Sequence, residues 1–422
     1  MRPLALFVSI LLLIVTAFAC EGETGGAPRT EVTTLPSDST TPTVDGDRTD
    51  AVMLWTLRSR DAFHLAEVAG PMLPSPDGRW ALTLASPHVA FDLATLTSAP
   101  IPSEVTDAST VEWVGDGLLH AITVPDAHYL FDFETRTLAP MQRHPGGELV
   151  GFMASGEQAY LRGTGGARIL VLVDDSGAQY RTDELTTRPA LSPDRRRIVG
   201  MSEEDVLVLT SGSVARIEVP GERISDGALV RWAQNSDSVA IASLTMPRIL
   251  LLEIQAGTLR EILPSAPISD LFWSSRGGLA VQAGATIVFL STSSLSELDS
   301  VDGARFLGWN PSGDFAALAI ESCLADSNGK VAVADVAGTI VATVKATSPV
   351  RYVQWSPNGE LLAVGAGSSV RVYALRDLLG SSAASPLDVI ALGASAAPMA
   401  HWSPDGEYLM VWNGIAANSP CP

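Results

Sequence analysis

The chain has 422 residues, is 46% hydrophobic and 18% charged, and carries 47 acidic against 27 basic residues, for a formal net charge of −20. The apolar content excludes a disordered chain, and the acidic balance argues against a nucleic-acid partner, which needs a basic face. Two or three domains would be usual at this length, unless the chain is a repeat protein.

Residues 1–20 are predicted to be a targeting segment. A short basic start is followed by an apolar run from Leu4 to Phe18, which is too short to span a bilayer comfortably as a permanent helix. Ala17 and Ala19 fit a signal-peptidase site, and Cys20 directly after them resembles the lipidated cysteine of a bacterial lipobox, although Ala17 replaces the usual Leu. We favour a lipoprotein over plain secretion or an uncleaved anchor. All three place the body outside the cytoplasm, in the periplasm or on the cell envelope.

Residues 21–50 are predicted to be a disordered tether. They are rich in Gly, Thr, Ser, Pro and acids, and their only large apolar residues are Val32, Leu35 and Val44. Such a segment cannot bury enough surface to offset the entropy of ordering it. Its root-mean-square reach would be roughly 30 Å. The alternative is a disordered tail with no anchoring role.

A short phrase recurs along the rest of the chain. It reads "QWSPNGELLAVG" at 354–365 and "HWSPDGEYLMVW" at 401–412. Nine copies can be aligned at their first position, which is Pro74, Trp113, Phe152, Leu191, Trp232, Trp273, Trp309, Trp355 or Trp402. The first and last copies are 328 residues apart, a mean of 41 residues per step. A period of 40–45 residues is typical of four-stranded propeller blades.

Each copy contains the signals of four short strands. A β run such as "VRYVQW" precedes the turn, in which Pro sets φ, Asp or Asn bonds its own backbone, and Gly accepts a positive φ. Runs such as "ELLAVGA", "SVRVYAL" and "TLREIL" supply the second, third and fourth strands. The aromatic residue at the turn is predicted to pack between neighbouring blades.

The two ends of the repeat region complement each other. Residues 51–68 contain two β runs with no phrase before them, and the last copy contains two strands before the chain stops. Pairing these ends closes the ring and removes an exposed sheet edge. We therefore predict that residues 51–422 form a single all-β, closed β-propeller of about eight to nine four-stranded blades, the last blade being closed by N-terminal strands. Nine blades exceed the usual four to eight, so the alternative is that the shortened copy at Trp273 forms no proper blade.

The phrases "WSPDGEYLMV", "WSPNGELLAV" and "PSPDGRWALT" resemble the WD40-like PD40 repeat of TolB-type β-propellers. The resemblance covers about residues 51–422 and rests on turn and packing residues, so it implies a fold rather than an activity. The α/β domain that precedes the TolB propeller has no counterpart here. Neither has the hydrolase domain that follows the propeller in some serine peptidases. Those two functions are therefore not expected.

No motif of a catalytic or metal centre is recognised. The six histidines are His64, His88, His120, His128, His144 and His401; they fall in neighbouring units and show no HExxH or H-x-H spacing. A metal site among them is an alternative to scattered histidines, which we favour. A nucleophile elbow and a phosphate loop are absent. "RGTGGAR" at 162–168 is interpreted as a loop, and "DSNG" at 326–329 as a turn rather than a calcium site.

Loops that join the second and third strands of each unit share one face of a propeller, and this is the predicted binding face. Its charged residues are Asp126, His128, Arg162, Arg168, Glu203, Glu204, Asp205, Arg248, Glu321 and Asp326. For each of them the alternative is an ordinary solvated loop charge.

Cys323 and Cys421 are predicted to form a disulfide. If Cys20 is lipidated, they are the only thiols left, and an extracytoplasmic compartment permits the bond. Each follows the second strand of its unit, so both emerge on the same face. The tail from Gly414 reaches at most roughly 23–25 Å. The alternative is two unpaired cysteines.

The sequence therefore favours an exported, membrane-tethered, monomeric propeller that acts as a non-enzymatic binding or scaffold module. Its expected partner is a protein, peptide or glycan on one propeller face, with the membrane held through the N-terminal lipid and with no cofactor. The alternative is an extracytoplasmic enzyme of the lactonase or lyase kind with a site on the propeller axis.

Overall fold

The computed structural model describes residues 51–414, apart from a set of short segments in loops. The segments that it leaves out are 61, 68–71, 85–86, 96, 124–126, 142–146, 164–167, 175–178, 220–223, 225–227, 265, 295, 321–328, 347, 381–383 and 393–396. The predictions for the targeting segment, the tether and the Cys323–Cys421 bond lie outside the described residues.

The described residues form nine four-stranded antiparallel sheets, here called blades 1 to 9 in ring order. Blade 1 comprises β3 (Met72–Pro74), β4 (Trp80–Thr83), β5 (Ala90–Asp92) and β6 (Thr97–Ala99). Blade 2 comprises β7 (Thr110–Gly115), β8 (Leu118–Thr123), β9 (Ala127–Asp132) and β10 (Thr137–Met141). Blade 3 comprises β11 (Gly147–Phe152), β12 (Gln158–Arg162), β13 (Arg168–Val173) and β14 (Gln179–Leu185).

Blades 4 to 6 continue the series. Blade 4 comprises β15 (Ala190–Leu191), β16 (Ile198–Met201), β17 (Asp205–Thr210) and β18 (Ser213–Glu218). Blade 5 comprises β19 (Ala228–Trp232), β20 (Ser238–Ser243), β21 (Ile249–Glu253) and β22 (Thr258–Ile262). Blade 6 comprises β23 (Asp270–Trp273), β24 (Leu279–Ala283), β25 (Thr286–Ser291) and β26 (Ser296–Asp302).

Blades 7 to 9 complete the ring. Blade 7 comprises β27 (Ala304–Trp309), β28 (Phe315–Ile320), β29 (Lys330–Asp335) and β30 (Ile340–Lys345). Blade 8 comprises β31 (Val350–Trp355), β32 (Leu361–Ala366), β33 (Ser369–Ala374) and β34 (Asp388–Ala391). Blade 9 combines the two ends of the region: β35 (Ala397–Trp402), β36 (Tyr408–Gly414), β1 (Ala51–Thr56) and β2 (Ala62–Glu67).

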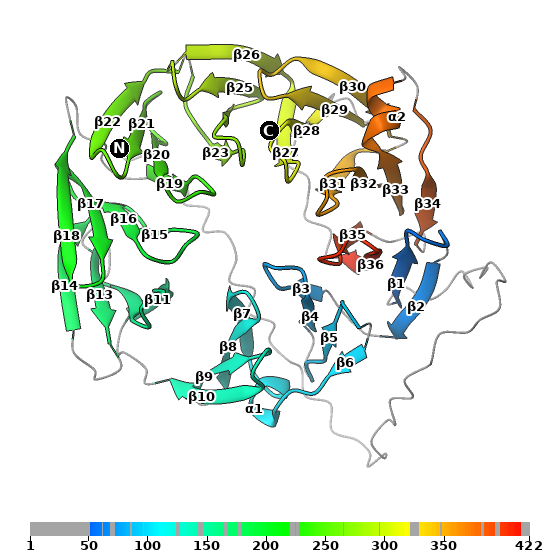
Figure 1. The fold of residues 1–422 in the computed structure, drawn as a ribbon, viewed down its shortest axis with the longest axis horizontal. Coiled ribbons are helices and arrows are strands. Elements are labelled where there is room, and N and C mark those ends of the chain that lie inside the picture. Colours follow the sequence, from blue (N-terminus) through cyan, green and yellow to red (C-terminus); the bar gives the residue numbers. More distant parts are fainter. Residues whose placement is uncertain are drawn as a thin grey trace, which may run out of the picture. The chain divides into compact units, whose positions relative to one another are not determined.

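The predicted closure is confirmed. The order in blade 9 is β2-β1-β36-β35, and β1 pairs antiparallel with β36 from Met53 opposite Val411 to Thr56 opposite Tyr408. The copy at Trp273 forms a complete sheet, so among the described residues the ring has nine blades, and the alternative of a failed copy is wrong. Figure 1 shows the ring, with the first strand of each blade nearest its centre.

The recurring turn is stabilised by its serine and by a residue with positive φ. The Ser356 hydroxyl accepts the Leu361 N–H at 2.9 Å and donates to Asn358 at 2.7 Å, and Ser356 is fully buried. The turn glycines have φ near +70°, for example Gly359 at 72° and Gly406 at 73°. Glycine suits this left-handed region because it has no Cβ. Two copies place Arg195 and Ser236 there, at 57° and 62°.

The tryptophans of the phrase join neighbouring blades, as predicted. Each indole Nε1–H donates to the carbonyl of the residue that precedes the aligned position in the previous blade. The six pairs are Trp113 to Leu73 (3.0 Å), Trp232 to Ala190 (2.9 Å), Trp273 to Arg231 (3.0 Å), Trp309 to Phe272 (3.0 Å), Trp355 to Gly308 (3.3 Å) and Trp402 to Gln354 (3.3 Å). We call these contacts the indole junctions.

The hydrophobic core is divided into clusters that lie between blades. One cluster joins Val331 and Val344 of blade 7 to Val350, Leu362 and Tyr373 of blade 8. All five side chains are buried, and burial of apolar surface is favourable by about 25 cal/mol per Å². The side chains of each sheet therefore hold the next sheet in place around the ring.

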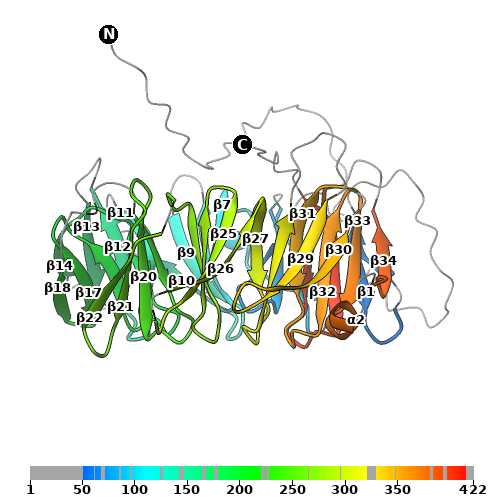
Figure 2. The same cartoon turned by 90° about the horizontal axis from the view of Figure 1, so that it is seen from above.

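The two ends of the ring axis differ in their connections. We call one end the turn face, because it holds the turns between the first and second strands and between the third and fourth strands of each blade. We call the other end the loop face, because it holds the loops between the second and third strands and the crossovers between blades. Helix α1 (Ser103–Thr106) lies in a crossover, and α2 (Leu375–Gly380) lies between β33 and β34, on the turn face, at the bottom of Figure 2. Neither these helices nor any other described segment is a helix long and apolar enough to cross a membrane.

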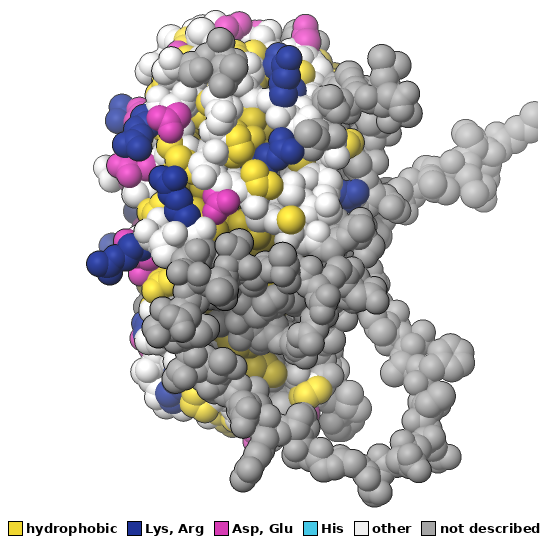
Figure 3. Space-filling model, turned by 90° about the vertical axis from the view of Figure 1, so that its right-hand side faces the viewer, with side chains coloured by type: hydrophobic (Ala, Val, Ile, Leu, Met, Phe, Trp, Pro, Cys, Tyr) yellow, Lys and Arg dark blue, Asp and Glu magenta, His cyan; other side chains and the backbone are white. Residues whose placement is uncertain are grey.

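The outermost strands carry several exposed hydrophobic side chains. Leu298 on β26, Ile340 on β30 and Val389 on β34 are 47%, 43% and 48% exposed. Figure 3 shows the side of the ring at the right of Figure 1, where hydrophobic side chains are scattered among polar ones and most visible charged side chains lie toward one edge. The rim seen there is mainly neutral, so the charged contacts have to be sought at the two faces and the centre.

Candidate functional site

Charged side chains are exposed along the innermost strands. The two faces of such a strand are covered by neighbouring blades, so an exposed side chain there opens toward the centre of the ring or beyond the strand end. We call seven residues the axial charges: Glu112, Glu148, Arg231, Asp270, Arg305 and Arg351 on innermost strands, and Arg188 on the crossover before β15. They come from seven consecutive blades, from blade 2 to blade 8.

The axial charges pair with one another in part. Arg188 Nη2 lies 2.5 Å from Glu148 Oε1, and Arg231 Nη2 lies 3.0 Å from Asp270 Oδ1. Arg305 donates to the Val350 carbonyl at 3.2 Å. Ion pairs with this exposure contribute only about 0–1 kcal/mol each, because water and salt screen them. A charged ligand could therefore displace the ion-pair partners of these side chains at a small cost in free energy.

A hydrogen-bonded row of three titratable side chains begins at Glu112. Glu112 on β7 stands opposite His120 on β8, and the His120 Nδ1–H donates to Glu112 Oε1 over 2.8 Å. His120 Nε2 lies 2.9 Å from Nδ1 of His128 on β9, with the two rings stacked at 5.1 Å. His120 is buried, whereas the Glu112 side chain is 56% exposed. The row thus runs from an exposed carboxylate through a buried imidazole to His128.

The electrostatics of this row determine its proton positions. The hydrogen bond from His120 outweighs partial burial and holds the pKa of Glu112 below its usual value. Burial, and then the neighbouring His120 charge, lower the pKa of His128. Because an ionised carboxylate can only accept, the His120 Nδ1–H is the donor to Glu112, and a neutral His120 then accepts from His128 at Nε2. The row is therefore hydrogen-bonded from the exposed Glu112 carboxylate to the His128 ring.

A third histidine, His401 on β35 of blade 9, lies against residues of blades 8 and 1 and has a structural environment. His401 Nδ1 lies 2.8 Å from Gln354 Nε2, and burial lowers the pKa of His401 to about 4, against a smaller opposing effect of Asp77. A Cβ added to Gly78 of blade 1 would lie 2.9 Å from His401 Nε2. His401 is thus neutral near pH 7. It lies where blade 9, formed by the last copy of the phrase, meets blade 1.

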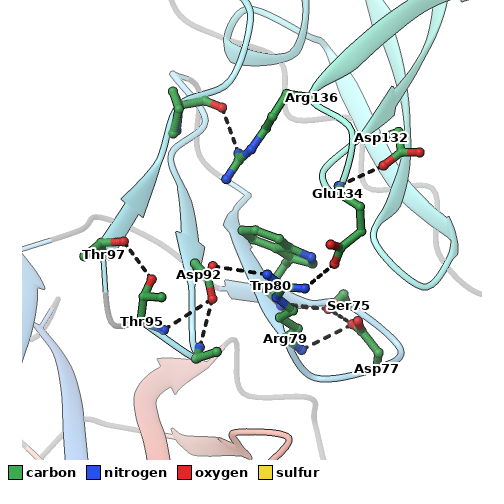
Figure 4. Close-up of polar contacts among 12 residues, drawn as sticks. Ser75, Asp77, Arg79, Trp80, Asp92, Thr95, Thr97, Asp132, Glu134 and Arg136 are labelled. Carbon is green, nitrogen blue, oxygen red and sulfur yellow. Dashed lines mark hydrogen bonds and ion pairs between the residues drawn. The ribbon is translucent and has the colours of Figure 1, made fainter.

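A polar cluster on the turn face joins blades 1 and 2 (Figure 4). Arg79 pairs with Glu134 and lies 3.7 Å from Asp92. The guanidinium carbons of Arg79 and Arg136 lie 4.8 and 5.0 Å from the Trp80 ring centroid. Trp80 is 1% exposed and also packs on Phe133, so this cluster acts as a joint between blades rather than as an open site.

The predicted binding-face residues are spread around the loop face. The described ones lie at strand ends or loops: His128 on β9, Arg162 on β12, Arg168 on β13, Glu203 and Glu204 between β16 and β17, Asp205 on β17, and Arg248 before β21. Arg248 is 5% exposed and its Nε donates to Glu261 at 2.5 Å, so it has a structural ion pair. Only His128 joins the row described above. Asp126, Glu321 and Asp326 lie outside the described residues.

Sequence reasoning missed the axial charges, although a signal was present. Glu112 and Arg231 stand directly before the aligned tryptophan of their copies, in "VEW" and "VRW". The first strand of a blade is expected to be buried, so a charge within that run marks a side chain that must reach open space. Among the described residues, no group of three or more His, Cys, Asp or Glu side chains is arranged to hold a metal ion.

Comparisons with known proteins identify the class of fold. No family model and no curated protein match the chain. The crystal structure of the eukaryotic initiation factor superposes with a TM-score of 0.59 at 13% identity, covering 85% of this chain and 97% of that one. A chain of the dihydro-heme d1 dehydrogenase NirN in complex with DHE gives 0.49 at 11% identity, over 88% and 78% of the two chains.

These similarities are to distant proteins. At such low identity the first of them supports the fold alone, and the second is too weak to support any argument. Together with the sheet topology, the first defines the chain as a β-propeller, and the described residues form nine blades of it.

Proposed function

We propose that this protein is a non-enzymatic binding or scaffold module that receives a protein, peptide or glycan at the loop face and centre of its ring. The observation that carries the proposal is the set of axial charges on seven consecutive blades, of which all but the half-buried Asp270 are exposed. Their backbones are held by paired strands and, in five of the seven blades, by an indole junction, so the charges are positioned before a partner arrives. Preorganised charges favour specific association because little ordering remains to be done on binding.

We further propose that the repeat belongs to the WD40-like PD40 type found in TolB-type propellers. The proposal is supported by the hydrogen bonds of the recurring turn. Ser403 donates to Asp405 at 2.6 Å and accepts the Tyr408 N–H at 3.0 Å, as Ser356 does with Asn358 and Leu361. The Ser-Pro-Asp/Asn-Gly phrase thus has a structural reason to be repeated.

The proposed location is the bacterial cell envelope, with the propeller tethered to a membrane through a lipid on Cys20. Replacing Cys20 by Ala should move the exported protein from the membrane fraction to the soluble fraction. Membrane association that survives both this substitution and signal removal would contradict the lipid anchor.

The binding role can be tested by site-specific photocrosslinking in the native host. A photoreactive residue at Thr110, exposed on innermost strand β7, should give a discrete adduct with a partner. The matched control is Val389, which is 48% exposed on outer strand β34. Adducts from the rim position alone, or none from Thr110 and other axial positions, would contradict the proposed face.

A second candidate function is supported by the row Glu112–His120–His128. In this row the Glu112 carboxylate orients the His120 ring, and His120 orients the His128 ring. A histidine held in this way by a carboxylate is typical of a general base. The alternative function is therefore an extracytoplasmic enzyme of the lactonase or lyase kind. A panel of lactones should then be turned over with a pH profile that depends on His128. Unchanged turnover in His128→Asn and Glu112→Gln variants would exclude the row from any activity found.

A further inference from the structure

Apolar side chains from both sides join most pairs of neighbouring blades. The described residues form eight hydrophobic clusters, which join blades 1 and 2, 3 and 4, 4 and 5, 5 and 6, 6 and 7, 7 and 8, 8 and 9, and 9 and 1. Among the same residues, no such cluster joins blade 2 to blade 3, which are neighbours in the ring (Figure 1). An indole junction is not possible there either, because Phe152 occupies the aligned position of blade 3. Within the described ring, this junction therefore differs from all the others.

The face of blade 2 that is turned toward blade 3 is polar at its centre. Leu119 and Ala121 on β8 belong to the cluster shared with blade 1, so His120 between them faces blade 3. Glu112 stands directly opposite His120 on β7, and the His128 ring is hydrogen-bonded to the His120 ring. The whole Glu112–His120–His128 row thus lies on this face, and its buried central side chain is an imidazole.

The aliphatic side chains on the same face are incompletely covered. Leu130 on β9 stands opposite His120, and Ile122 on β8 stands opposite His128. Both aliphatic side chains are only half-buried, as is Leu118 at the other end of β8. Blade 3 therefore leaves part of the apolar surface of blade 2 in contact with water.

Blade 3 turns an apolar surface toward this row. Leu170 and Leu172 belong to the cluster shared with blade 4, so Val171 between them on β13 faces blade 2. Tyr160 stands opposite Val171 on β12, and both side chains are buried. A buried imidazole that faces such a surface contributes less to the association of two blades than an aliphatic side chain would, because its polar atoms lose hydration there.

We propose that the junction between blades 2 and 3 is the joint at which the ring opens, and that the Glu112–His120–His128 row is the reason. Local openings of a folded protein occur where few buried apolar contacts hold its parts together. The clusters at the eight other junctions would keep the remaining blades together. Opening would move Glu112 of blade 2 away from Glu148 of blade 3, and so give the axial charges a second arrangement. This inference does not depend on the proposed binding function.

The opening can be measured by thiol labelling of the full-length protein. Val171→Cys places a thiol in the proposed joint, and Val288→Cys places one in the cluster that joins blades 5 and 6. The two positions match, because each valine is buried on the third strand of its blade and faces the preceding blade. A pulse of N-ethylmaleimide is followed by peptide mapping, which counts label at the native cysteines separately. Each rate is divided by the rate for the same thiol in urea-unfolded protein.

Label should enter position 171 about tenfold faster than position 288 after this correction, because burial of one aliphatic side chain shifts an equilibrium by about that factor or more. His120→Leu should slow labelling at position 171 and leave position 288 unchanged, because an aliphatic side chain can pack on blade 3. His128→Leu makes the same test at a half-buried position, should the first variant not fold. Thermal unfolding checks that each variant is folded.

Equal corrected rates at the two positions, or a faster rate at position 288, would overturn the proposed joint. A rate at position 171 that is the same in the wild-type background and in both leucine variants would reject the row as its cause. These measurements use no partner, so their failure is distinguishable from failure of the binding function.

Discussion

The junction between blades 5 and 6 and the junction between blades 3 and 4 are built from different chemistry. At the first, the Trp273 indole donates to the Arg231 carbonyl at 3.0 Å. At the second, Leu191 occupies the aligned position and cannot donate. There the contacts are the Arg188–Glu148 ion pair, the Ser211 hydroxyl on Glu157 and the Ala154 N–H on the Arg195 carbonyl at 2.7 Å. The Arg231–Asp270 ion pair also joins blades 5 and 6, so the difference between the two junctions is the indole donor, which only the first has.

The comparison indicates which contacts between blades should depend on the salt concentration. A half-buried neutral hydrogen bond depends little on salt, whereas exposed ion pairs are screened within about 8–10 Å at physiological ionic strength. The charged junctions adjoin blades 2 to 4, and the Glu112–His120–His128 row lies in blade 2. The contacts between blades 3 and 4 should therefore respond to salt more than the indole hydrogen bonds do.

The largest loss of stability is expected from opening the ring at blade 9, because contacts between blades depend on its closure. Deleting residues 51–68 removes β1 and β2 and exposes the edge of β36, which pairs with β1 from Val411 to Tyr408. An unpaired apolar edge favours aggregation. We expect insoluble or aggregated protein by size-exclusion chromatography. A truncated protein as stable as the intact propeller would show that closure by the N-terminal strands is dispensable.

The junction at His401 should be the most sensitive to pH. Its pKa is depressed to about 4 in the folded state, so the unfolded chain binds more protons between the ordinary value of 6.5 and 4. Stability from this group is present above pH 6.5 and is lost as the pH falls toward 4, by up to about 3 kcal/mol. Urea unfolding at pH 7 and pH 4.5 should show a smaller loss for His401→Gln. Equal losses in the variant and the wild type would contradict a buried neutral His401.

An indole junction should be weakened by removal of its donor alone. Trp273→Phe keeps an aromatic ring and leaves the Arg231 carbonyl without its partner, so we expect a loss of about 1–3 kcal/mol in unfolding free energy. The loss should be nearly independent of salt. A matched control is Phe152→Leu, which alters packing at an aligned position without removing a hydrogen bond. A strongly salt-dependent effect of Trp273→Phe would remove the distinction between the two junction types.

The smallest effect is expected at the charged junction. Arg188→Gln removes the ion pair with Glu148, whose side chains are 69% and 54% exposed, so the loss should be below about 1 kcal/mol. The difference from the wild type should shrink between low salt and 0.5 M salt in chemical unfolding. A larger loss that salt leaves unchanged would mean that Arg188 acts through packing rather than charge.

The sequence by itself determined the repeat and its closure. The period of about 41 residues, the turn residues and the two unmatched ends predicted an all-β propeller closed by its N-terminal strands, and the topology confirms it. These features are local: positive φ at Gly359 or Gly406 and the serine hydrogen bonds follow from residues within one turn. Local preferences of this kind can be recognised without knowledge of any other part of the chain.

The tertiary structure alone decided which side chains meet. Register and bulges, such as the shift between Trp113 and Gly115, place Glu112 opposite His120 and bring His128 to it from a third strand. The approach of Gly329 to Ser348 and Val350 likewise joins the start of β29 to the crossover before β31. A one-residue slip would turn each side chain to the opposite face of its sheet. Because pairing between strands sets that register, the repeat pattern predicted the blades, and only the folded ring could show the axial charges and the Glu112–His120–His128 row.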